Sequence, residues 1–202
     1  MHSQVDPFAG RWFTGADMRA EPWAGAVVEE ATFDGCDLSG IRAAGGTWRH
    51  TRVTGSTLRG ADLAGLTTSD SSLLQVDLDH ARLTGSSWLR GRWRDLRAHG
   101  VQAEALSAFE SSWSHVTMQG VNLRDADFSD ATWDHVHLID CDLTRARFAG
   151  LRVHRVHLQG CDLSGISGID SLRGARLGRT DAISALEAMA DHLGIQITEG
   201  DL

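Results

Sequence analysis

The sequence lacks lysine and tyrosine entirely, and its 202 residues include only two prolines and three cysteines. All 19 basic residues are therefore arginines, and 27 acidic residues bring the net charge to −8. This negative balance argues against direct binding of nucleic acid, because a protein that holds the phosphate backbone needs a basic surface. An odd number of cysteines is typical of reduced thiols rather than of a disulfide framework.

Long apolar runs are also absent. No stretch of 18 apolar residues occurs, so we expect no membrane span. Residues 1–6 lack the basic and then apolar pattern of a secretion signal, which together with the odd cysteine count predicts a cytoplasmic protein. The apolar content of 42% is nevertheless too high for a disordered chain, so the sequence predicts a folded domain.

A repeat of five residues runs through most of the chain. Every fifth position from Phe8 to Gly168 holds Val, Leu, Met, Phe or Trp in 27 of 33 cases. The position two residues earlier is small or aliphatic in nearly every repeat, as at Cys36 and Ala61. A strand has a period of about 2 and a helix one of about 3.6. A period of five therefore indicates a chain that turns a corner every five residues and points both positions inward.

The repeat weakens between residues 96 and 110, where the central positions are Ala98, Ala103 and Ala108. The residues two places earlier are larger in each case: Leu96, Val101 and Leu106. A close-packed interior needs its total volume conserved, and these neighbours restore the volume that the alanines lack. We therefore expect one unbroken register through this stretch, with a loop as the open alternative.

Several repeats resemble those of a known family. Cys36-Asp37-Leu38-Ser39-Gly40 and Ala61-Asp62-Leu63-Ala64-Gly65 are similar to the A(D/N)LxG motif of the pentapeptide-repeat family. The resemblance implies an all-β fold, a right-handed quadrilateral β-helix with four repeats in each coil. About eight coils then cover residues 6–165, and at a strand spacing of ~4.8 Å they make a rod roughly 38 Å long. We expect this solenoid to occupy residues 1–170.

The remaining residues, 171–202, follow a different pattern. Thr180 or Asp181 can cap a helix, and Gly194 suits the end of one. Between them apolar residues recur at helical spacing, and Ile195-Gln196-Ile197 follows as a short extended piece. A solenoid has to cover its last coil, so the simplest role for this C-terminal helix is that of a cap.

The tail also resembles the C-terminal helix that pairs two protomers in the gyrase-interacting branch of the family, the MfpA and Qnr proteins. The resemblance implies a homodimer formed through this helix. The residues that would form the interface are the apolar ones of the tail: Ile183, Leu186, Met189, Leu193 and Ile195.

No catalytic or cofactor-binding pattern is present. The sequence contains neither a phosphate-binding loop nor a Gly-x-Ser-x-Gly turn, so we predict a protein that is not an enzyme and needs no cofactor. Cys141 and Cys161 lie twenty residues apart and so stack on successive coils, within disulfide range. Their place in the small inward series favours reduced thiols that fill the core.

Histidines gather at one outward corner of the predicted coil. His115 stacks against His135, and His137 against His157, with His154 beside them. Imidazoles at such spacing can converge on a metal ion. We expect no acidic or cysteine ligand to complete the set, and therefore no metal site.

Charge separates by face when the chain is divided into coils of twenty residues. The face centred on Phe8, Val28 and every twentieth residue after them holds eight acidic residues and three arginines, a net charge of −5. The next face along the chain, centred on Phe13 and Phe33, has a net charge of +3. We call them the acidic face and the basic face.

We predict that the acidic face binds a protein partner. Phe109 stands on an outward row above Leu89, where it either folds inward over Ala108 or forms an exposed anchor. The candidate partner-binding residues are Glu29, Glu30, Asp70, Glu110, Asp127, Asp130, Leu89 and Phe109.

The resemblance to the MfpA and Qnr branch implies mimicry of duplex DNA toward DNA gyrase or a related type II topoisomerase, with resistance to quinolones or a natural gyrase poison. Duplex DNA about 38 Å long carries roughly 22 charges, far more than this acidic face. Mimicry would therefore depend on that face and on two paired rods. The alternatives are a general interaction scaffold with another partner, and a metal- or ligand-binding solenoid that uses the histidine corner.

Overall fold

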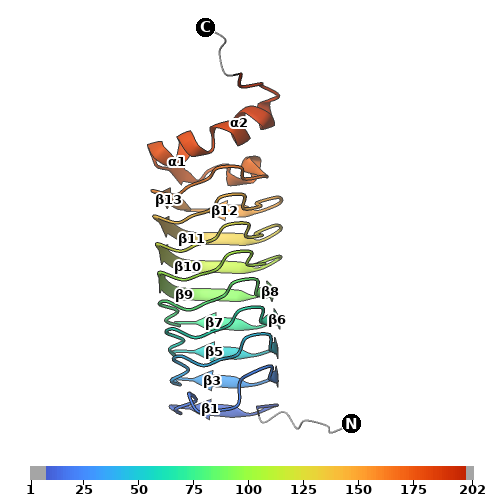
Figure 1. Cartoon of the computed structure of the whole chain (residues 1–202), viewed down its shortest axis with the longest axis vertical. Coiled ribbons are helices and arrows are strands. Elements are labelled where there is room, and N and C mark those ends of the chain that lie inside the picture. The colour runs from blue at the N-terminus through green and yellow to red at the C-terminus, as the bar shows by residue number, and fades with distance from the viewer. Residues whose placement is uncertain (1–7, 199–202) are drawn as a thin grey trace.

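The computed structural model describes residues 8–198, which wind into a single straight column of about eight coils (Figure 1). Strands of successive coils pair in parallel, and in the regular coils each residue lies beside the one twenty positions later, as with Phe13 and Phe33. The same register joins Trp113 to Trp133. The predicted fold, a parallel β-solenoid with a helical C-terminal end, is confirmed.

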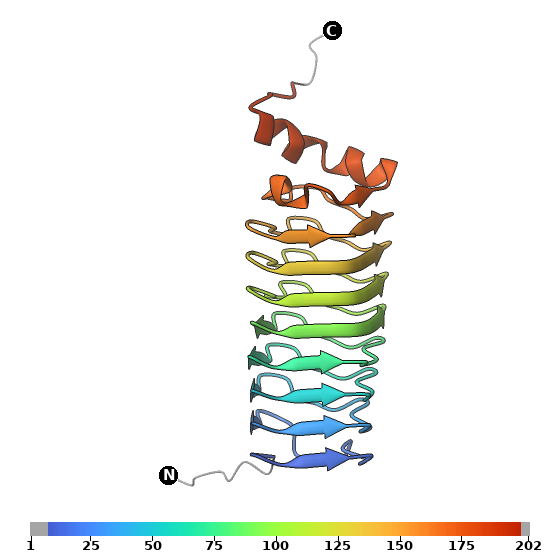
Figure 2. The same cartoon turned by 180° about the vertical axis from the view of Figure 1, so that it is seen from behind.

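Two sheets form the sides of the column. The ten-stranded sheet begins on the basic face and extends onto the next face along the chain, where β13 and β14 lie. It consists of β1 (Trp12–Thr14), β3 (Thr32–Asp34), β5 (Arg52–Thr54), β7 (Ser72–Leu74), β9 (Arg92–His99), β10 (Ser112–Gln119), β11 (Thr132–Ile139), β12 (Arg152–His154), β13 (His157–Gln159) and β14 (Arg176–Leu177). The four-stranded sheet lies on the acidic face and consists of β2 (Val27–Glu29), β4 (Thr47–Arg49), β6 (Thr67–Ser69) and β8 (Ser87–Leu89). Isolated bridges join the coils elsewhere, for example between Arg42 and Asp62. Strands β9–β11 are longer because they continue through a corner onto the third face, which is centred on Met18, Leu38 and every twentieth residue after them (Figure 2).

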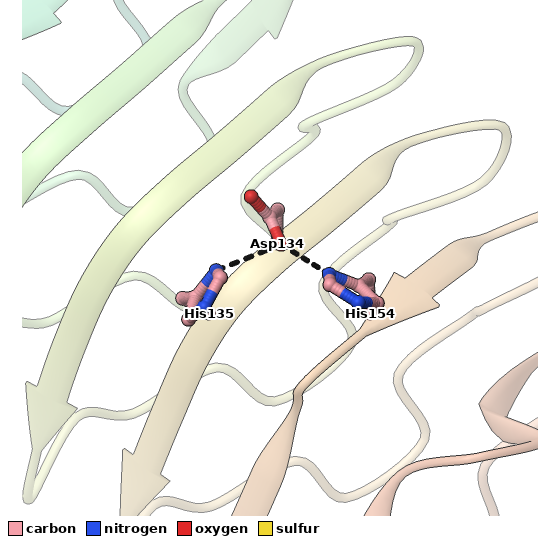
Figure 3. A group of neighbouring side chains, drawn as sticks. All are labelled: Asp134, His135 and His154. Carbon is pink, nitrogen blue, oxygen red and sulfur yellow. Dashed lines mark hydrogen bonds and ion pairs between the residues drawn. The ribbon is translucent and has the colours of Figure 1, made fainter.

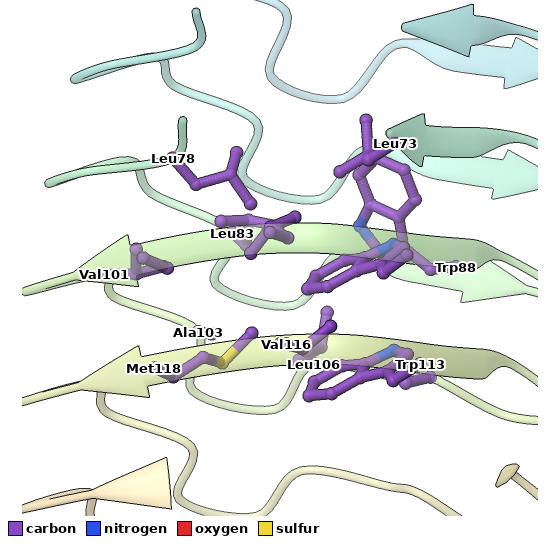
Figure 4. Packing of buried hydrophobic residues seen from close by; sticks show 14 of the residues in the cluster. Leu73, Leu78, Leu83, Trp88, Val101, Ala103, Leu106, Trp113, Val116 and Met118 are labelled. Atoms are coloured by element: carbon purple, nitrogen blue, oxygen red, sulfur yellow. The ribbon is translucent and has the colours of Figure 1, made fainter. Parts of the chain in front are cut away.

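The core fills the inside of the column along its whole length. Figure 4 shows part of it in the middle coils. The central positions point inward as predicted, and Leu63 and Leu123 are completely buried. The rings of Trp93, Trp113 and Trp133 form one stack, with centroid distances of 4.7 Å and 5.5 Å. Flat rings repeat well at the spacing of coils, so burial and stacking both favour the register.

Most polar residues at the small inward position are satisfied by the backbone, although the buried Ser111 hydroxyl has no hydrogen-bond partner among the described residues. The Ser56 hydroxyl accepts the N–H of Cys36 at 2.9 Å and donates to the carbonyl of Thr54 at 2.8 Å. Ser71 accepts the N–H of Thr51 in the same way, at 3.1 Å. A buried hydroxyl costs little when it is hydrogen-bonded, which explains why serine can stand where other coils have alanine.

The register stays unbroken through residues 96–110. Ala98, Ala103 and Ala108 are all buried, and isolated bridges place Gln102 and Ser107 beside the residues twenty positions away. The expected compensation of volume is therefore confirmed, and the alternative of a loop in this stretch is wrong.

The C-terminal end differs in detail from the predicted single helix. A 3-10 turn, η1 (Ile169–Leu172), leads to β14, and the helices α1 (Arg179–Ser184) and α2 (Leu186–Leu193) then cross the end of the column. Gly178, rather than Thr180 or Asp181, precedes the first helical residue. Gly194 ends α2 with φ 70°, as predicted. Residues 195–197 form no strand.

Asp181 explains why α1 begins early. Its side chain is completely buried, and its two carboxylate oxygens accept the N–H groups of Cys161 and Gly178, each at 2.7 Å. The Ser184 hydroxyl accepts the N–H of Leu163 at 2.9 Å. Cys161 and Leu163 belong to the last regular coil, so α1 supplies the acceptors that a following coil would otherwise provide.

Within residues 8–198, no helix is long and apolar enough to cross a membrane.

Candidate functional site

Four of the predicted partner-binding residues form one column on the surface. Glu30, Asp70, Glu110 and Asp130 are exposed and occupy equivalent places in their coils, at the corner between the acidic and basic faces. Each has a left-handed backbone, with φ between 51° and 56°, which turns the chain at the corner. We call these four residues the acidic column. Asp6, another acid of this face, lies outside the described residues.

Arginines from neighbouring coils neutralise part of the acidic face. Arg90 donates two hydrogen bonds to Asp70, at 2.8 Å and 2.7 Å, and its other terminal nitrogen lies 4.0 Å from Glu110. Hydrogen bonds from Arg90 hold the pKa of Asp70 below its usual value. Glu29 pairs with Arg49 at 2.8 Å.

Asp127, another predicted partner-binding residue, pairs with Arg147 at 3.0 Å. Among residues 8–198, Glu30, Asp130 and Asp170 make no ion pair. The uncompensated negative charge of the acidic face therefore lies toward the two ends of the column rather than at its middle.

A groove of mixed charge follows the same corner at mid-column. It has a volume of about 540 Å³ and is lined by His50, Arg52, Asp70, Ser72, Arg90, Arg92, Glu110 and Ser112. Leu89 and Phe109 lie nearby on the acidic face, and both are half-buried. Phe109 therefore neither enters the core nor projects fully from the surface.

The histidine corner forms the second surface of interest. The rings of His115 and His135 are stacked at 4.7 Å, and those of His137 and His157 at 4.8 Å, as predicted from their spacing. The expectation that no acidic ligand completes the set is wrong. Asp134 Oδ1 lies 2.8 Å from His135 Nδ1 and 2.7 Å from His154 Nδ1 (Figure 3).

The geometry of the coil explains this cluster. Asp134 on β11 pairs directly with His154 on β12, because the two residues are twenty positions apart, and His135 is its chain neighbour. The potential ligand atoms of these three residues all lie within 4.8 Å of one another. The twenty-residue offset between Asp134 and His154 in the sequence predicts this arrangement. The spacing of the histidines alone does not.

The cysteines are buried core thiols. Cys36, Cys141 and Cys161 are all free, which confirms the predicted reduced state. The adjacent Cys141 thiol, together with burial, raises the pKa of Cys161. A protonated, buried thiol is a poor nucleophile, so Cys161 has the character of a packing residue.

The C-terminal helices present an apolar surface. Ile183, Leu186, Leu193 and Ile195 are exposed, and Leu193 has 70% of its surface accessible. Met189, the fifth residue of the predicted dimer interface, is only half exposed and packs against the core. At the opposite end Trp12 is 74% exposed, so it does not close the column.

Comparison with known proteins identifies the five-residue repeat in part of the chain. The family described as pentapeptide repeats matches residues 126–165, with eight copies. No curated protein matches the chain. Among solved structures the chain is similar to HetL from the cyanobacterium Nostoc sp. strain PCC 7120, at 19% identity over 83% of this chain and 85% of that one, with a TM-score of 0.31.

A second solved structure is trypsin-treated QnrB1, described as a plasmid-mediated fluoroquinolone resistance protein. The identity is 24% over 95% of this chain and 99% of that one, with a TM-score of 0.31. At these identities and TM-scores, neither structure indicates a partner for this chain.

Proposed function

This chain belongs to the pentapeptide-repeat family, and we propose that it acts without catalysis, by occupying the DNA-binding surface of a type II topoisomerase such as DNA gyrase. The observation that carries the proposal is the acidic column of Glu30, Asp70, Glu110 and Asp130, exposed along one edge of a straight rod. Negative charges fixed along a straight support are what a DNA-binding surface recognises in the phosphate backbone.

The spacing of the acidic column sets how such a surface would be used. Successive coils are ~4.8 Å apart, so acids two coils apart are separated by about 10 Å. Duplex DNA carries a charge about every 1.7 Å. The acidic column therefore supplies a few charges at fixed positions, and binding would depend on where those charges meet the basic residues of the partner.

We further propose that two rods pair through α1 and α2. Ile183, Leu186 and Leu193 form an exposed apolar surface at one end of the column, and exposed apolar patches on small proteins commonly mark an interface. A second copy of the chain is the proposed occupant, because two rods joined end to end would double the length of the acidic edge.

Substituting both Leu186 and Leu193 with Glu is expected to give a monomer, because the charges would be buried in the paired helices. The measurement is molar mass by light scattering at micromolar concentration, with circular dichroism to verify the solenoid. The matched control is His192→Glu with Gln196→Glu, at exposed polar positions of the same segment. A wild-type protein that is monomeric under these conditions would contradict pairing.

The consequence proposed for the cell is resistance to quinolones or to a natural gyrase poison. This consequence requires a drug that acts on the complex between the topoisomerase and DNA. A protein that occupies the DNA-binding surface lowers the amount of that complex and thus the damage caused by the drug.

The test is charge reversal of the acidic column. Asp70→Arg, Glu110→Arg and Asp130→Arg together are expected to abolish the effect of the protein on gyrase supercoiling and on drug-induced DNA cleavage. The wild-type effect should also weaken as salt increases, because exposed charges are screened within about 8–10 Å. Thermal stability should change little, since exposed ion pairs contribute little to folding.

The control reverses three acids of the third face, Asp17, Asp37 and Asp77, and so produces the same change in net charge. These acids also pair with arginines of their own face, Arg19 and Arg59, so both triple variants break ion pairs. The proposal predicts that the control variant keeps most of the effect on gyrase. Equal loss in both variants would mean that only net charge matters.

A general interaction scaffold is the second candidate, and one observation favours it. Arg90 lies between Asp70 and Glu110 and neutralises the middle of the acidic column. The groove of mixed charge beside it suits a protein partner with both acidic and basic groups. A wild-type protein with no effect in the gyrase assays would favour this candidate.

A further inference from the structure

We propose that Asp134, His135 and His154 form a binding site for a divalent transition-metal ion of the zinc type. Two imidazole nitrogens and one carboxylate oxygen are a donor set that such ions prefer. The three ligand atoms lie within 4.8 Å of one another, and Figure 3 shows both rings directed at the same carboxylate.

The distances are close to those that a bound ion requires. Ligands about 2.0–2.2 Å from a tetrahedral zinc ion are separated from one another by a little over 3 Å. The carboxylate oxygen of Asp134 is now 2.8 Å from one imidazole nitrogen and 2.7 Å from the other. Small side-chain rotations would open this space, and all three side chains reach solvent. Water would complete the coordination.

The solenoid holds the ligands in place. Asp134 and His135 are on β11, and His154 is on β12, which pairs with β11 residue by residue. A metal ion at this site would therefore link two successive coils near the C-terminal end. Ligands fixed by a rigid sheet lose little conformational entropy on binding.

Arg155 opposes the ion. Its Nη1 lies 2.8 Å from His135 Nε2, and a guanidinium can only donate hydrogen bonds. His135 Nε2 is therefore the acceptor, so the ring proton is on Nδ1 and is donated to Asp134. Metal binding at Nδ1 would move the proton of the neutral ring to Nε2, and Arg155 would have to turn away. The structure thus assigns to Arg155 the role of a residue that weakens the site.

The experiment is titration of the purified protein with Zn²⁺. Binding is measured by calorimetry and by competition with a chromophoric chelator. The expected result is saturable Zn²⁺ binding by the wild-type protein. Asp134→Asn and His154→Gln should each lower the affinity for one bound ion by roughly tenfold or more. In contrast, Arg155→Gln should tighten the same site, because it removes a positive charge and offers an oxygen acceptor to His135 Nε2–H. Substituting outer partners of metal ligands typically changes affinity by about 10- to 100-fold. Mg²⁺ should not compete, because it prefers oxygen ligands.

The matched control is His137→Gln with His157→Gln, which removes the stacked histidine pair that has no carboxylate between its rings. Under the proposal this variant keeps the zinc ion. Loss of binding in the control but not in His154→Gln would overturn the assignment and indicate adventitious binding along the histidine corner. Absence of Zn²⁺ binding by the wild-type protein would overturn it as well. Since His154 and Asp134 are surface residues, circular dichroism should show both variants folded.

Discussion

Leu123→Lys is expected to abolish folding. Leu123 is completely buried among the apolar side chains that fill the column, and the backbone groups around it are paired between coils. An isolated ammonium group placed there would cost several kcal/mol, whereas the whole free energy of unfolding of a domain is typically about 5–15 kcal/mol. Each coil also supports its neighbours, so the damage would spread along the column.

The measurement is thermal unfolding by circular dichroism together with size-exclusion chromatography. We expect Leu123→Lys to be aggregated or without a cooperative transition. The control is Gln102→Lys, which adds the same charge at an exposed position of the preceding coil and should unfold like the wild-type protein. A soluble Leu123→Lys variant that unfolds cooperatively near the wild-type temperature would contradict the inward position of the central residues.

Asp181→Ala is expected to lower the free energy of unfolding by about 3 kcal/mol. The substitution removes the acceptors of two N–H groups, of Cys161 and Gly178, and an unsatisfied buried donor costs roughly 1–3 kcal/mol. It also leaves the last regular coil with only the Ser184 hydroxyl, which accepts the N–H of Leu163, as a side-chain hydrogen bond to α1. Chemical denaturation measures the total loss, and hydrogen exchange locates it.

Exchange should accelerate first at the amides of Cys161 and Leu163, while the amides of β9–β11 stay protected. Asp191→Ala in α2 is the control, because Asp191 is exposed and should be replaced with little effect. Equal stability of Asp181→Ala and the wild-type protein would show that the C-terminal helices do not cap the column.

The five-residue repeat predicted the column well because its cause is local and regular. Each corner places the same two positions inward, so the register of a distant pair such as Trp113 and Trp133 follows from counting in steps of twenty. The register of the weak stretch around Ala103 could also be predicted, because conservation of volume depends on neighbours two residues apart. The division of the chain at residue 170 stays a prediction, although β14 beyond it still pairs with β13.

The details at the end of the column could not be predicted in the same way. Thr180 and Asp181 are residue types that cap helices, but the side chain of Asp181 turns toward the last coil because the N–H group of Cys161 needs an acceptor there. Gly178 then precedes the first helical residue, and the helix divides at Ala185. This choice depends on contacts that no local pattern records.

The surface clusters fall between these two cases. The pairs of Asp70 with Arg90 and of Asp134 with His154 each join residues twenty positions apart, so the coil period brings them together. The period does not encode the rotamers that the side chains adopt. These rotamers decide how much of the acidic face is neutralised. The sequence therefore indicated the acidic face but overstated its free charge.

Competition with DNA tests the central claim most directly. A labelled DNA duplex bound to gyrase is titrated with the wild-type protein, and the bound DNA is followed by fluorescence anisotropy. If the acidic column occupies the DNA-binding surface, the protein should displace the duplex completely, and the Asp70, Glu110 and Asp130 triple reversal should not. A protein that binds gyrase while the duplex stays in place, or that does not bind gyrase at all, would contradict the account.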